Sequence, residues 1–492
     1  MLSTIEIPYH EVQRRLSMDN PWWQSGRGID EEERSWPQRA YFEHFKRFAG
    51  DRSFKRAVVL IGPRRVGKTV MLRQFVQSLL DQGTRGVDIL YLSLDTPLYA
   101  GRTLESLLRL FMEVHRHGES DRLWVLFDEI QYLKNWEVHL KSLVDSYPHV
   151  RFVASGSAAA ALRMKSRESG AGRFTEVVLP PLTFAEFLSF IGTEASLIDA
   201  APGREGRSGT PVCRDITALN ARFIDYLNFG GFPESVMNPA VRADPSRFIR
   251  QDVVDKVLLK DLPSLYGVAD TQDLNRFFNM MAFNTGNELG LEQISKHSEI
   301  GKQRLGEYLE YLEAAYLLRR VHRVDDNATR LRRARTFKLH LTNPSIRAAL
   351  FGLVGAEDDA MGRLAETALW SQWMHSPELS GSLHYARWKE GRRDLEVDLV
   401  SVEPGTQRPR FAAEIKWSDR IVDHPEELRG LVEFSSRHRL VTPPTVTTRT
   451  VSRTAIIAGV QVRFLPAALY CYIVAKSMAG GDAAGSAAAG TE

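Results

Sequence analysis

Residues 57–69 read AVVLIGPRRVGKT, an apolar run that leads directly into a Gly-x-x-x-x-Gly-Lys-Thr pattern. The apolar run predicts a buried strand, and the helical spacing of apolar residues over 71–80 predicts a helix behind the loop. In that context the loop backbone turns successive N–H groups toward phosphate oxygens. The stretch therefore predicts an α/β fold that binds a nucleoside triphosphate, with ATP as the expected ligand.

Each demanding position of the loop carries a suitable residue. Gly62 and Gly67 allow the tight backbone turn, Lys68 reaches the β- and γ-phosphates, and Thr69 is a ligand for Mg²⁺. The alternative is a chance glycine-rich turn. The predicted nucleotide-binding residues are Gly62, Pro63, Arg64, Arg65, Val66, Gly67, Lys68 and Thr69.

A second apolar run, 123–127, ends in two carboxylates, Asp128 and Glu129. A continuous apolar run is typical of a buried parallel strand, and α/β sheets bind ligands at the carboxyl ends of such strands. Asp128 suits the magnesium shell, and Glu129 is placed to act as a general base on water. The pair predicts ATP hydrolysis. The alternative is that Asp128 caps a helix and Glu129 is solvated.

Serines close the next predicted strand, at 154–157. We expect Ser155 or Ser157 to face the γ-phosphate as a polar sensor, with Ser157 the candidate binding residue. A turn or a helix cap formed by the same serines is the competing interpretation.

Composition excludes several classes of protein. The chain has 492 residues, 43% of them hydrophobic, and a net charge of +3, so a nucleic-acid surface would have to be a local patch. Two cysteines, Cys213 and Cys471, are too few for a disulfide framework. No apolar run approaches the roughly 20 residues that span a bilayer, and residues 1–9 lack a signal pattern. We expect a cytoplasmic protein with no membrane partner.

Apolar patterns divide the chain into segments. We predict strands at 57–61, 88–94, 122–128, 150–155 and 174–179, and helices at 37–48, 70–80, 103–115 and 135–146. This alternation implies a parallel sheet with helices on both faces, ended by Pro180-Pro181. The expected domains are an N-terminal lead-in at 1–55, a P-loop ATPase core at 56–190, an insertion loop and helical lid at 191–270, a winged-helix-like domain at 271–345, a C-terminal domain at 346–475 and a disordered tail at 476–492. The loop is expected at 192–215, where Gly, Ala, Ser and Pro are frequent.

Six short motifs occur along the chain in a recognisable order. They are the P-loop, Phe127-Asp128-Glu129-Ile130-Gln131, Ser155-Gly156-Ser157, Gly172-Arg173, the run Leu179 to Leu188, and Gly230-Gly231-Phe232-Pro233-Glu234. This order resembles prokaryotic AAA-type ATPases, related to AAA+ and STAND ATPases, that carry a C-terminal domain of unknown function. The resemblance covers about residues 35 to 475. It implies a nucleotide-binding core, a helical lid and a winged-helix-like segment.

The resemblance also implies roles for three residues. Arg173 matches the arginine of the family's Gly-Arg pair, a candidate finger that contacts the γ-phosphate in cis or from a neighbouring subunit of a homo-oligomer. Gly231 and Pro233 match the Gly-x-Pro lid motif that packs near the nucleotide. An ordinary surface arginine is the alternative for Arg173.

Residues 291–324 have a helix-turn-helix-like order. We predict helices at 291–297 and 302–317 and a strand at 318–324, with Lys302, Gln303 and Arg304 at the start of a recognition helix. Basic residues follow where the wing of a winged helix would lie, namely Arg330, Arg332, Arg333, Arg335 and Lys338. These residues would hold DNA phosphates. The alternative is a winged fold used for protein packing, with a solvated basic hairpin.

The C-terminal third carries a second set of chemical residues. Glu366 lies in a predicted helix, 362–373; Asp398 ends the run 394–398; and Glu414 and Lys416 share a predicted strand, 411–417. This order resembles the PD-(D/E)xK nuclease core, and so implies a restriction-endonuclease-like α/β domain. Asp398 and Glu414 would bind Mg²⁺, Lys416 would activate water, and Glu366 would add a carboxylate. Two departures are Asn343, where the family often has aspartate, and the lack of a further glutamine after Lys416.

Two main hypotheses follow. The first is an ATPase coupled to a metal-dependent DNA nuclease or DNA-binding domain, in DNA processing or defence. The second is a STAND-like nucleotide-controlled switch or scaffold that exposes a surface for a protein partner and does not cleave. A transcription regulator that uses the winged helix is a third and weaker hypothesis.

Overall fold

The computed structural model describes residues 8–24, 26–157, 172–199, 211–329, 336–374, 381–403, 405–440 and 442–479. The chain divides into two compact units, Met1–Pro180 and Pro181–Glu492. Each is described by itself below. None of the helices in the described ranges is both long and apolar enough to cross a bilayer.

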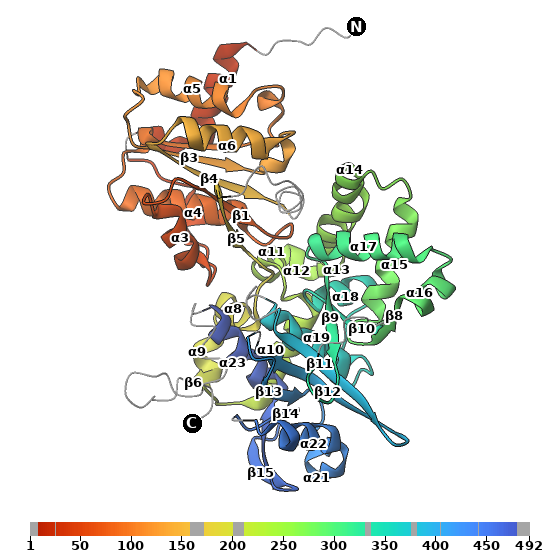
Figure 1. Cartoon of the computed structure of the whole chain (residues 1–492). Helices are drawn as coiled ribbons and strands as arrows, with labels where there is room; N and C mark the ends of the chain where they lie inside the picture. The colour runs from red at the N-terminus through yellow and green to blue at the C-terminus, as the bar shows by residue number, and fades with distance from the viewer. Residues whose placement is uncertain are drawn as a thin grey trace. The chain divides into compact units, whose positions relative to one another are not determined.

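The first unit is built on a parallel sheet, with α4 on one side and α5 and α6 on the other (Figure 1). Its strands, in the spatial order β2-β3-β4-β1-β5, are β2 (Ile89–Ser93), β3 (Leu123–Asp128), β4 (Val150–Gly156), β1 (Ala57–Ile61) and β5 (Phe174–Val178). Its helices are α1 (Tyr9–Asp19), η1 (Pro21–Trp23), α2 (Glu31–Ser35), α3 (Phe42–Gly50), α4 (Lys68–Asp81), η2 (Gly86–Asp88), η3 (Pro97–Tyr99), α5 (Leu104–His115), η4 (Ile130–Tyr132) and α6 (Trp136–Ser146). Because helices cover both faces, β1 and β3 are buried along their whole length. The predicted parallel α/β core is confirmed.

The N-terminal lead-in is an integral part of this unit. Asn20 Nδ2 donates to the carbonyl of Tyr91 at 2.9 Å, and the Tyr91 N–H donates to Asn20 Oδ1 at 2.6 Å. The helix expected at 37–48 begins later, at Phe42, and runs to Gly50. An edge strand would otherwise leave such backbone groups unpaired, so the lead-in completes the sheet at β2.

The second unit is built on a mixed sheet of nine strands among the described residues. In spatial order they are β15 (Arg453–Ile457), β16 (Val460–Pro466), β14 (Thr445–Thr448), β13 (Pro409–Glu414), β12 (Arg393–Val402), β11 (Leu383–Glu390), β9 (Leu318–Val324), β10 (Thr336–Leu341) and β8 (Glu288–Gly290). Strand β9 pairs in parallel with β11, through Arg323 opposite Tyr385. The hairpin expected as a wing is therefore continuous with the sheet that carries Asp398 and Glu414.

Helices of the second unit surround this sheet. They are α8 (Phe184–Phe190), α9 (Glu194–Leu197), α10 (Ile216–Phe229), α11 (Pro233–Met237), α12 (Pro239–Ala243), α13 (Pro245–Phe248), η6 (Ile249–Asp255), η7 (Val257–Asp261), α14 (Leu262–Tyr266), α15 (Thr271–Phe283), α16 (Leu291–Ser298), α17 (Lys302–Ala314), α18 (Ser345–Phe351), α19 (Met361–Trp373), α21 (Arg420–Asp423), η8 (Pro425–Leu428), α22 (Arg429–His438) and α23 (Ala467–Ala479). The helices predicted at 291–297, 302–317 and 362–373 thus occur as α16, α17 and α19 within a few residues.

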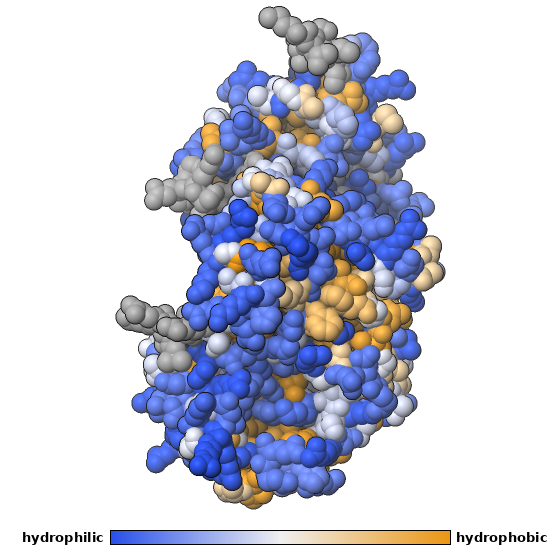
Figure 2. Space-filling model, turned by 90° about the vertical axis from the view of Figure 1, so that its right-hand side faces the viewer, coloured by the Kyte–Doolittle hydropathy of each residue, from blue (hydrophilic) through white to orange (hydrophobic). Residues whose placement is uncertain are grey.

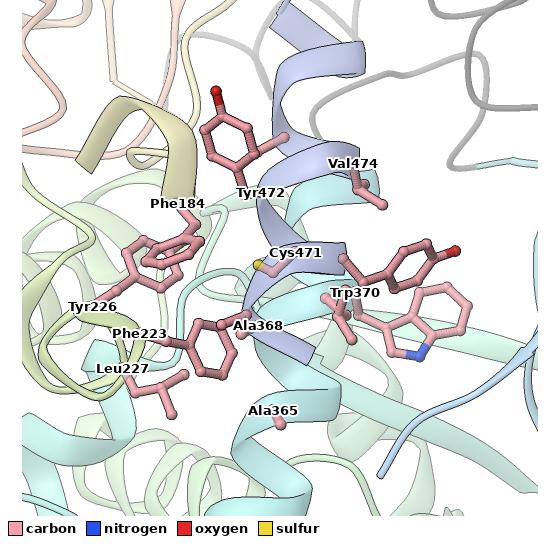
Figure 3. Packing of buried hydrophobic residues seen from close by; sticks show 14 of the residues in the cluster. Phe184, Phe223, Tyr226, Leu227, Ala365, Ala368, Trp370, Cys471, Tyr472 and Val474 are labelled. Carbon is pink, nitrogen blue, oxygen red and sulfur yellow. The ribbon is translucent and has the colours of Figure 1, made fainter. Parts of the chain in front are cut away.

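Two hydrophobic clusters lie on opposite faces of the sheet. Successive residues of a strand point to opposite faces, so Leu399 joins one cluster and Val400 the other. The larger cluster packs α8, α10, α19 and α23 together; Figure 3 shows Phe184 beside Tyr226 and Cys471 beside Ala368. Elsewhere, the face in Figure 2 is mainly hydrophilic, with apolar residues gathered in places between hydrophilic ones.

Two predictions about irregular segments need correction. The loop expected at 192–215 contains α9 and a short antiparallel ribbon, β6 (Ile198–Asp199) with β7 (Val212–Cys213), while 200–210 lie outside the described residues. Residues 476–479 were expected in a disordered tail but belong to α23, which buries Met478, while 480–492 lie outside the described residues. In both places a few apolar residues are enough to form a helix or a strand, because they pack against neighbouring structure.

Candidate functional site: a P-loop and a separate carboxylate cluster

The loop between β1 and α4 requires both of its glycines. A Cβ atom added at Gly62 would lie 2.1 Å from the carbonyl oxygen of Leu179, which is closer than any real contact. Gly67 has φ +94°, in the region that disfavours every residue with a side chain. Arg65 also adopts a left-handed conformation, with φ 63°. The sequence motif thus folds as the tight turn that it predicts.

The Lys68 ammonium lies inside this turn. Its Nζ donates to the carbonyl oxygen of Gly62 at 3.1 Å and to that of Pro63 at 2.7 Å. The side chain is only 5% exposed. Neutral carbonyl oxygens are weaker partners for an ammonium than phosphate oxygens are. The loop therefore keeps a buried positive charge where the motif predicts the phosphates.

Hydroxyl groups orient the Asp128 carboxylate at the end of β3. Thr69 Oγ1 and the Tyr91 hydroxyl each donate to Asp128 Oδ2 at 2.7 Å. Ser155 Oγ donates to the other oxygen, Oδ1. Strand β4 lies between β3 and β1, so Ser155 sits beside both the loop strand and the acidic strand. A hydroxyl and a carboxylate side by side form a donor set of the kind that magnesium takes, so these residues fit Mg²⁺.

Glu129 begins a hydrogen-bonded chain across the strand ends. It has φ 54°, a left-handed conformation that turns the chain sharply after β3. Gln131 Nε2 donates to Glu129 Oε2, and Gln131 Oε1 accepts the Ser157 N–H at 3.1 Å. Burial raises the pKa of Glu129, while Lys68 acts in the opposite direction. A carboxylate with a raised pKa is a better acceptor for a proton from water.

Ser157 offers an unused hydroxyl. Within the part of the chain that the structure describes, its buried Oγ has no hydrogen-bond partner. A buried polar atom without a partner costs free energy, so such atoms often mark a ligand contact. Together with the Lys68 position, this atom indicates that the residues present fit a nucleotide phosphate.

Three contributors to this site were missed by sequence reasoning. Tyr91 and Gln131 hold the two carboxylates, as described above. Arg39 supports the loop: its Nη1 donates to the carbonyl of Val66 at 2.7 Å and its Nη2 to that of Pro180 at 2.9 Å. Gln131 stood within a recognised motif, but nothing local in the sequence marks Arg39, 27 residues before its partner.

Arg173 lies at the amino ends of the strands, opposite the carboxyl ends where the loop lies. Its carbonyl accepts the Ala57 N–H at 2.9 Å, at the start of β1, whereas the loop follows the end of β1. Five strand residues at about 3.3 Å each separate those ends. The side chain pairs with Asp145 at 2.6 Å. A finger contact in cis does not follow from this register, and a contact from a neighbouring subunit stays a prediction.

The predicted lid residues belong to the second unit. A Cβ atom at Gly231 would lie 2.4 Å from Asn343 Oδ1, so close packing requires the glycine. Pro233 is the first residue of α11. Their role near a nucleotide stays a prediction.

The second set of predicted residues comes together in the second unit. Strand β12 lies antiparallel to β13, and the Leu399–Ala413 pair brings Asp398 and Glu414 to neighbouring positions. Lys416 Nζ lies 2.7 Å from Glu414 Oε1 and 3.6 Å from Asp398 Oδ2. We predicted that Glu414 and Lys416 share a strand, but β13 ends at Glu414. Lys416 follows the strand and still contacts Glu414.

Lys338 and Glu396 were not predicted to belong to this site, but both lie in it. Lys338 Nζ lies 2.7 Å from Glu396 Oε1, 2.9 Å from Glu366 Oε1 and 3.2 Å from Asp398 Oδ1. We expected Lys338 at the wing, either to hold DNA phosphates or to lie in a solvated basic hairpin, but its side chain is only 5% exposed. We define the carboxylate cluster by its acidic residues, Glu366, Glu396, Asp398 and Glu414.

The two lysines set the charge state of the cluster. Burial raises the pKa of Glu366 and that of Glu414 to about 7 each. Burial would also raise the pKa of Asp398, but Lys416 and Lys338 together hold it below its usual value. Burial opposes the charge of Lys338, yet Glu366, Asp398 and Glu396 raise its pKa well above normal. Both lysines are therefore charged at neutral pH.

The cluster as it stands does not fit a divalent metal ion. Asp398 Oδ1 accepts from Lys338, and Asp398 Oδ2 accepts the Ile415 N–H at 2.9 Å. Among the described residues, no group of three or more His, Cys, Asp and Glu side chains is placed to hold a metal. The predicted Mg²⁺ site at Asp398 and Glu414 is therefore not supported by this arrangement, because Lys338 and Lys416 each bind one oxygen of the pair.

The helix-turn-helix order is present as α16 and α17, with exposed Lys302, Gln303 and Arg304 at the start of α17. Lys302 pairs with Glu292 at 3.1 Å. The predicted wing arginines, Arg330, Arg332, Arg333 and Arg335, lie outside the described residues. DNA contact by this segment stays a prediction.

Comparisons with known proteins support the first unit more than the second. A family model described as an AAA domain matches residues 54–188, and one described as a domain of unknown function, DUF8612, matches residues 220–357. The second match includes Lys338 but ends before Glu366, Asp398 and Glu414.

Three curated relatives align with part of the chain, and each is named as an uncharacterized protein. One from Haemophilus influenzae is 25% identical over 54% of this chain and 62% of its own length. Two from Methanocaldococcus jannaschii are each 24% identical, over 53% and 71% of this chain and 55% and 73% of their own lengths. The chain thus spans about three fifths of the first two relatives.

A crystal structure of a DNA replication initiation factor aligns with 72% of this chain and 82% of its own, at 13% identity and a TM-score of 0.26. That score is too low for the likeness to bear on fold or function. The AAA match and the parallel sheet with its loop agree with each other without it. Residues 54–188 therefore match an AAA domain, and the first unit has the parallel sheet and phosphate-binding loop of a P-loop fold.

Proposed function

We propose that this chain hydrolyses ATP at the P-loop of its first unit, with Mg²⁺ as the cofactor. One observation carries the proposal: Lys68, Thr69 and Asp128 lie together at the carboxyl ends of β1 and β3. Binding of ATP without hydrolysis would need only the P-loop. Hydrolysis also needs a group that accepts a proton from water, and Glu129 follows Asp128 directly.

The residues of the site suggest how the reaction proceeds. Lys68 exchanges its two carbonyl partners for β- and γ-phosphate oxygens, and Thr69 with Asp128 would hold Mg²⁺, which offsets charge on the phosphates. Glu129 accepts the proton of the attacking water. Gln131 orients Glu129 and connects it to Ser157, which directly follows β4.

Replacing Glu129 with glutamine tests hydrolysis apart from binding. We expect Glu129→Gln to lower kcat for ATP hydrolysis by about 10²-fold, because the amide cannot accept the proton. The affinity for ATP, measured by titration of a fluorescent analogue, stays within about threefold of wild type, because Lys68 and the loop backbone are unchanged.

Glu119→Gln is the matched control, since Glu119 is an exposed glutamate of the same unit. It keeps the wild-type rate. Full hydrolysis by Glu129→Gln would refute Glu129 as the base.

We also propose that nucleotide occupancy controls the second unit as a switch, for a protein partner or for DNA. The carboxylate cluster, with two lysines bound to its oxygens, favours a domain that does not cleave in this state. A trans contact by Arg173 would join neighbouring chains, so a homo-oligomer belongs to the same proposal.

The nuclease remains the second candidate because the order of elements supports it. Helix α19, strands β11, β12 and β13, helix α22 and strand β14 follow one another, with Asp398 opposite Glu414. These elements carry Glu366, then Asp398, then Glu414 in the residue order on which the nuclease resemblance rests. The identities of Asp398, Glu414 and Lys416 fit it, whereas the position of Lys338 does not.

A cleavage assay distinguishes the two candidates. Linear, supercoiled and branched DNA are incubated with the full chain and Mg²⁺ or Mn²⁺, with and without ATP. We expect no cleavage that depends on Asp398, so wild type and Asp398→Asn give the same product pattern. Cleavage by wild type that is absent in Asp398→Asn would reject the switch and establish the nuclease.

A further inference from the structure

All three N–H donors of the Lys338 ammonium have a partner in the carboxylate cluster. An ammonium group has three N–H bonds, and three carboxylates surround Nζ at 2.7, 2.9 and 3.2 Å. Two of these distances are typical of charge-assisted hydrogen bonds. The number of acidic partners therefore matches the number of donors.

The same oxygens are those that a divalent ion would need. Magnesium coordinates oxygen at about 2.0–2.1 Å and so must approach each carboxylate more closely than the ammonium does. A divalent ion at Glu366 and Asp398 would occupy the space of Lys338 Nζ, or would lie beside a positive charge in a buried site. Both arrangements are unfavourable, because charges interact strongly where water is excluded.

The second lysine closes the other side of Asp398. Lys416 Nζ takes Glu414 Oε1 at 2.7 Å and lies 3.6 Å from Asp398 Oδ2. Glu414 Oε2 is buried and, among the described residues, has no hydrogen-bond partner. This oxygen gives the cluster unused capacity for a cation.

Lys338 is fixed in the sheet and is not a surface side chain that swings in. Strand β10 pairs on both sides, so Lys338 lies opposite Val321 of β9 and opposite Glu288 of β8. Its Nζ also lies 5.6 Å from the centre of the Tyr385 ring, a cation–π contact from a third strand. The ammonium is thus held in place by backbone pairing and by a ring.

We propose that Lys338 is the resident counter-cation of the carboxylate cluster, and that it excludes a divalent metal ion from Glu366 and Asp398. The proposal concerns the second unit and does not depend on ATP hydrolysis. In this proposal β10, which precedes Glu366 in the chain, determines which cation Glu366 and Asp398 bind.

Manganese binding to the full chain without nucleotide tests the proposal. Electron paramagnetic resonance measures free Mn²⁺ during titration of wild type, Asp398→Asn, Lys338→Met and the double variant. We expect wild type and Asp398→Asn to bind Mn²⁺ equally. Lys338→Met binds it on the order of tenfold more tightly, and the double variant loses that gain. The difference between variants at Asp398 removes any contribution of the P-loop.

Two results would overturn the proposal. One is Mn²⁺ binding by wild type that weakens in Asp398→Asn, since Lys338 would then not exclude the ion. The other is a folded Lys338→Met, checked by circular dichroism, with no gain in affinity. If Lys338→Met does not fold, the comparison of wild type with Asp398→Asn still decides. Lys302→Met, at an exposed lysine paired with Glu292, is the control and binds as wild type.

Discussion

We expect Lys68→Met to lower kcat/KM for ATP hydrolysis by on the order of 10³-fold, with ATP affinity also lost. The methionine side chain has a similar length but no charge, so it cannot replace the ammonium that lies at the turn. Unlike Glu129→Gln, this variant fails at binding as well as at turnover. Phosphate release under steady-state conditions and titration with a fluorescent ATP analogue measure the two effects separately.

The control is Lys55→Ala in the same unit. Lys55 is exposed and precedes the start of β1, whereas Lys68 follows its end. The two substitutions remove the same charge, so a general effect of charge on the unit would appear in both. Normal affinity for ATP in Lys68→Met would show that Lys68 does not bind the phosphates.

We expect Lys338→Met to lower the free energy of unfolding of the second unit by about 3–5 kcal/mol at neutral pH in the absence of metal. The loss arises because the buried Asp398 and the neighbouring Glu396 then lack their shared cation, while Glu366, whose pKa is already about 7, takes up a proton. The net value of a buried ion pair is small, but the removal of one partner leaves a buried charge unpaired. Urea denaturation followed by tryptophan fluorescence measures the loss.

An exposed ion pair of the same unit gives the comparison. Lys302 and Glu292 lie 3.1 Å apart, with side chains 58% and 60% exposed. Lys302→Met costs less than about 1 kcal/mol, because water already surrounds both charges. Equal losses for the two lysines would mean that the cluster does not depend on Lys338.

Local patterns predicted much of the first unit. The loop residues Gly62 to Thr69 and the pair Asp128-Glu129 are contiguous in sequence, and apolar strands precede both. Strand and loop chemistry therefore sufficed to bring them to one sheet edge. The same reasoning could not place Arg173, because its position depends on how β5 is registered against β1.

The position of Lys338 could not be read from charge along the chain. Four arginines occur at 330–335, so Lys338 looked like part of a basic surface. The useful signal was its setting in the strand Thr-Phe-Lys-Leu-His-Leu, where Lys338 and His340 alternate with apolar residues and are both buried. A lysine inside such a strand needs acidic partners, but only the fold shows that residues 28 to 60 positions later supply them.

The hairpin of β9 and β10 also limits how this protein can be rearranged by recombination. Because β9 pairs with β11, a junction placed near residue 345 would cut β8, β9 and β10 away from the sheet and leave backbone groups of β11 without their partners. An exposed strand edge invites pairing with other chains and aggregation. The helix-turn-helix segment and the sheet beyond it are therefore not interchangeable cassettes, and are expected to be inherited as one piece.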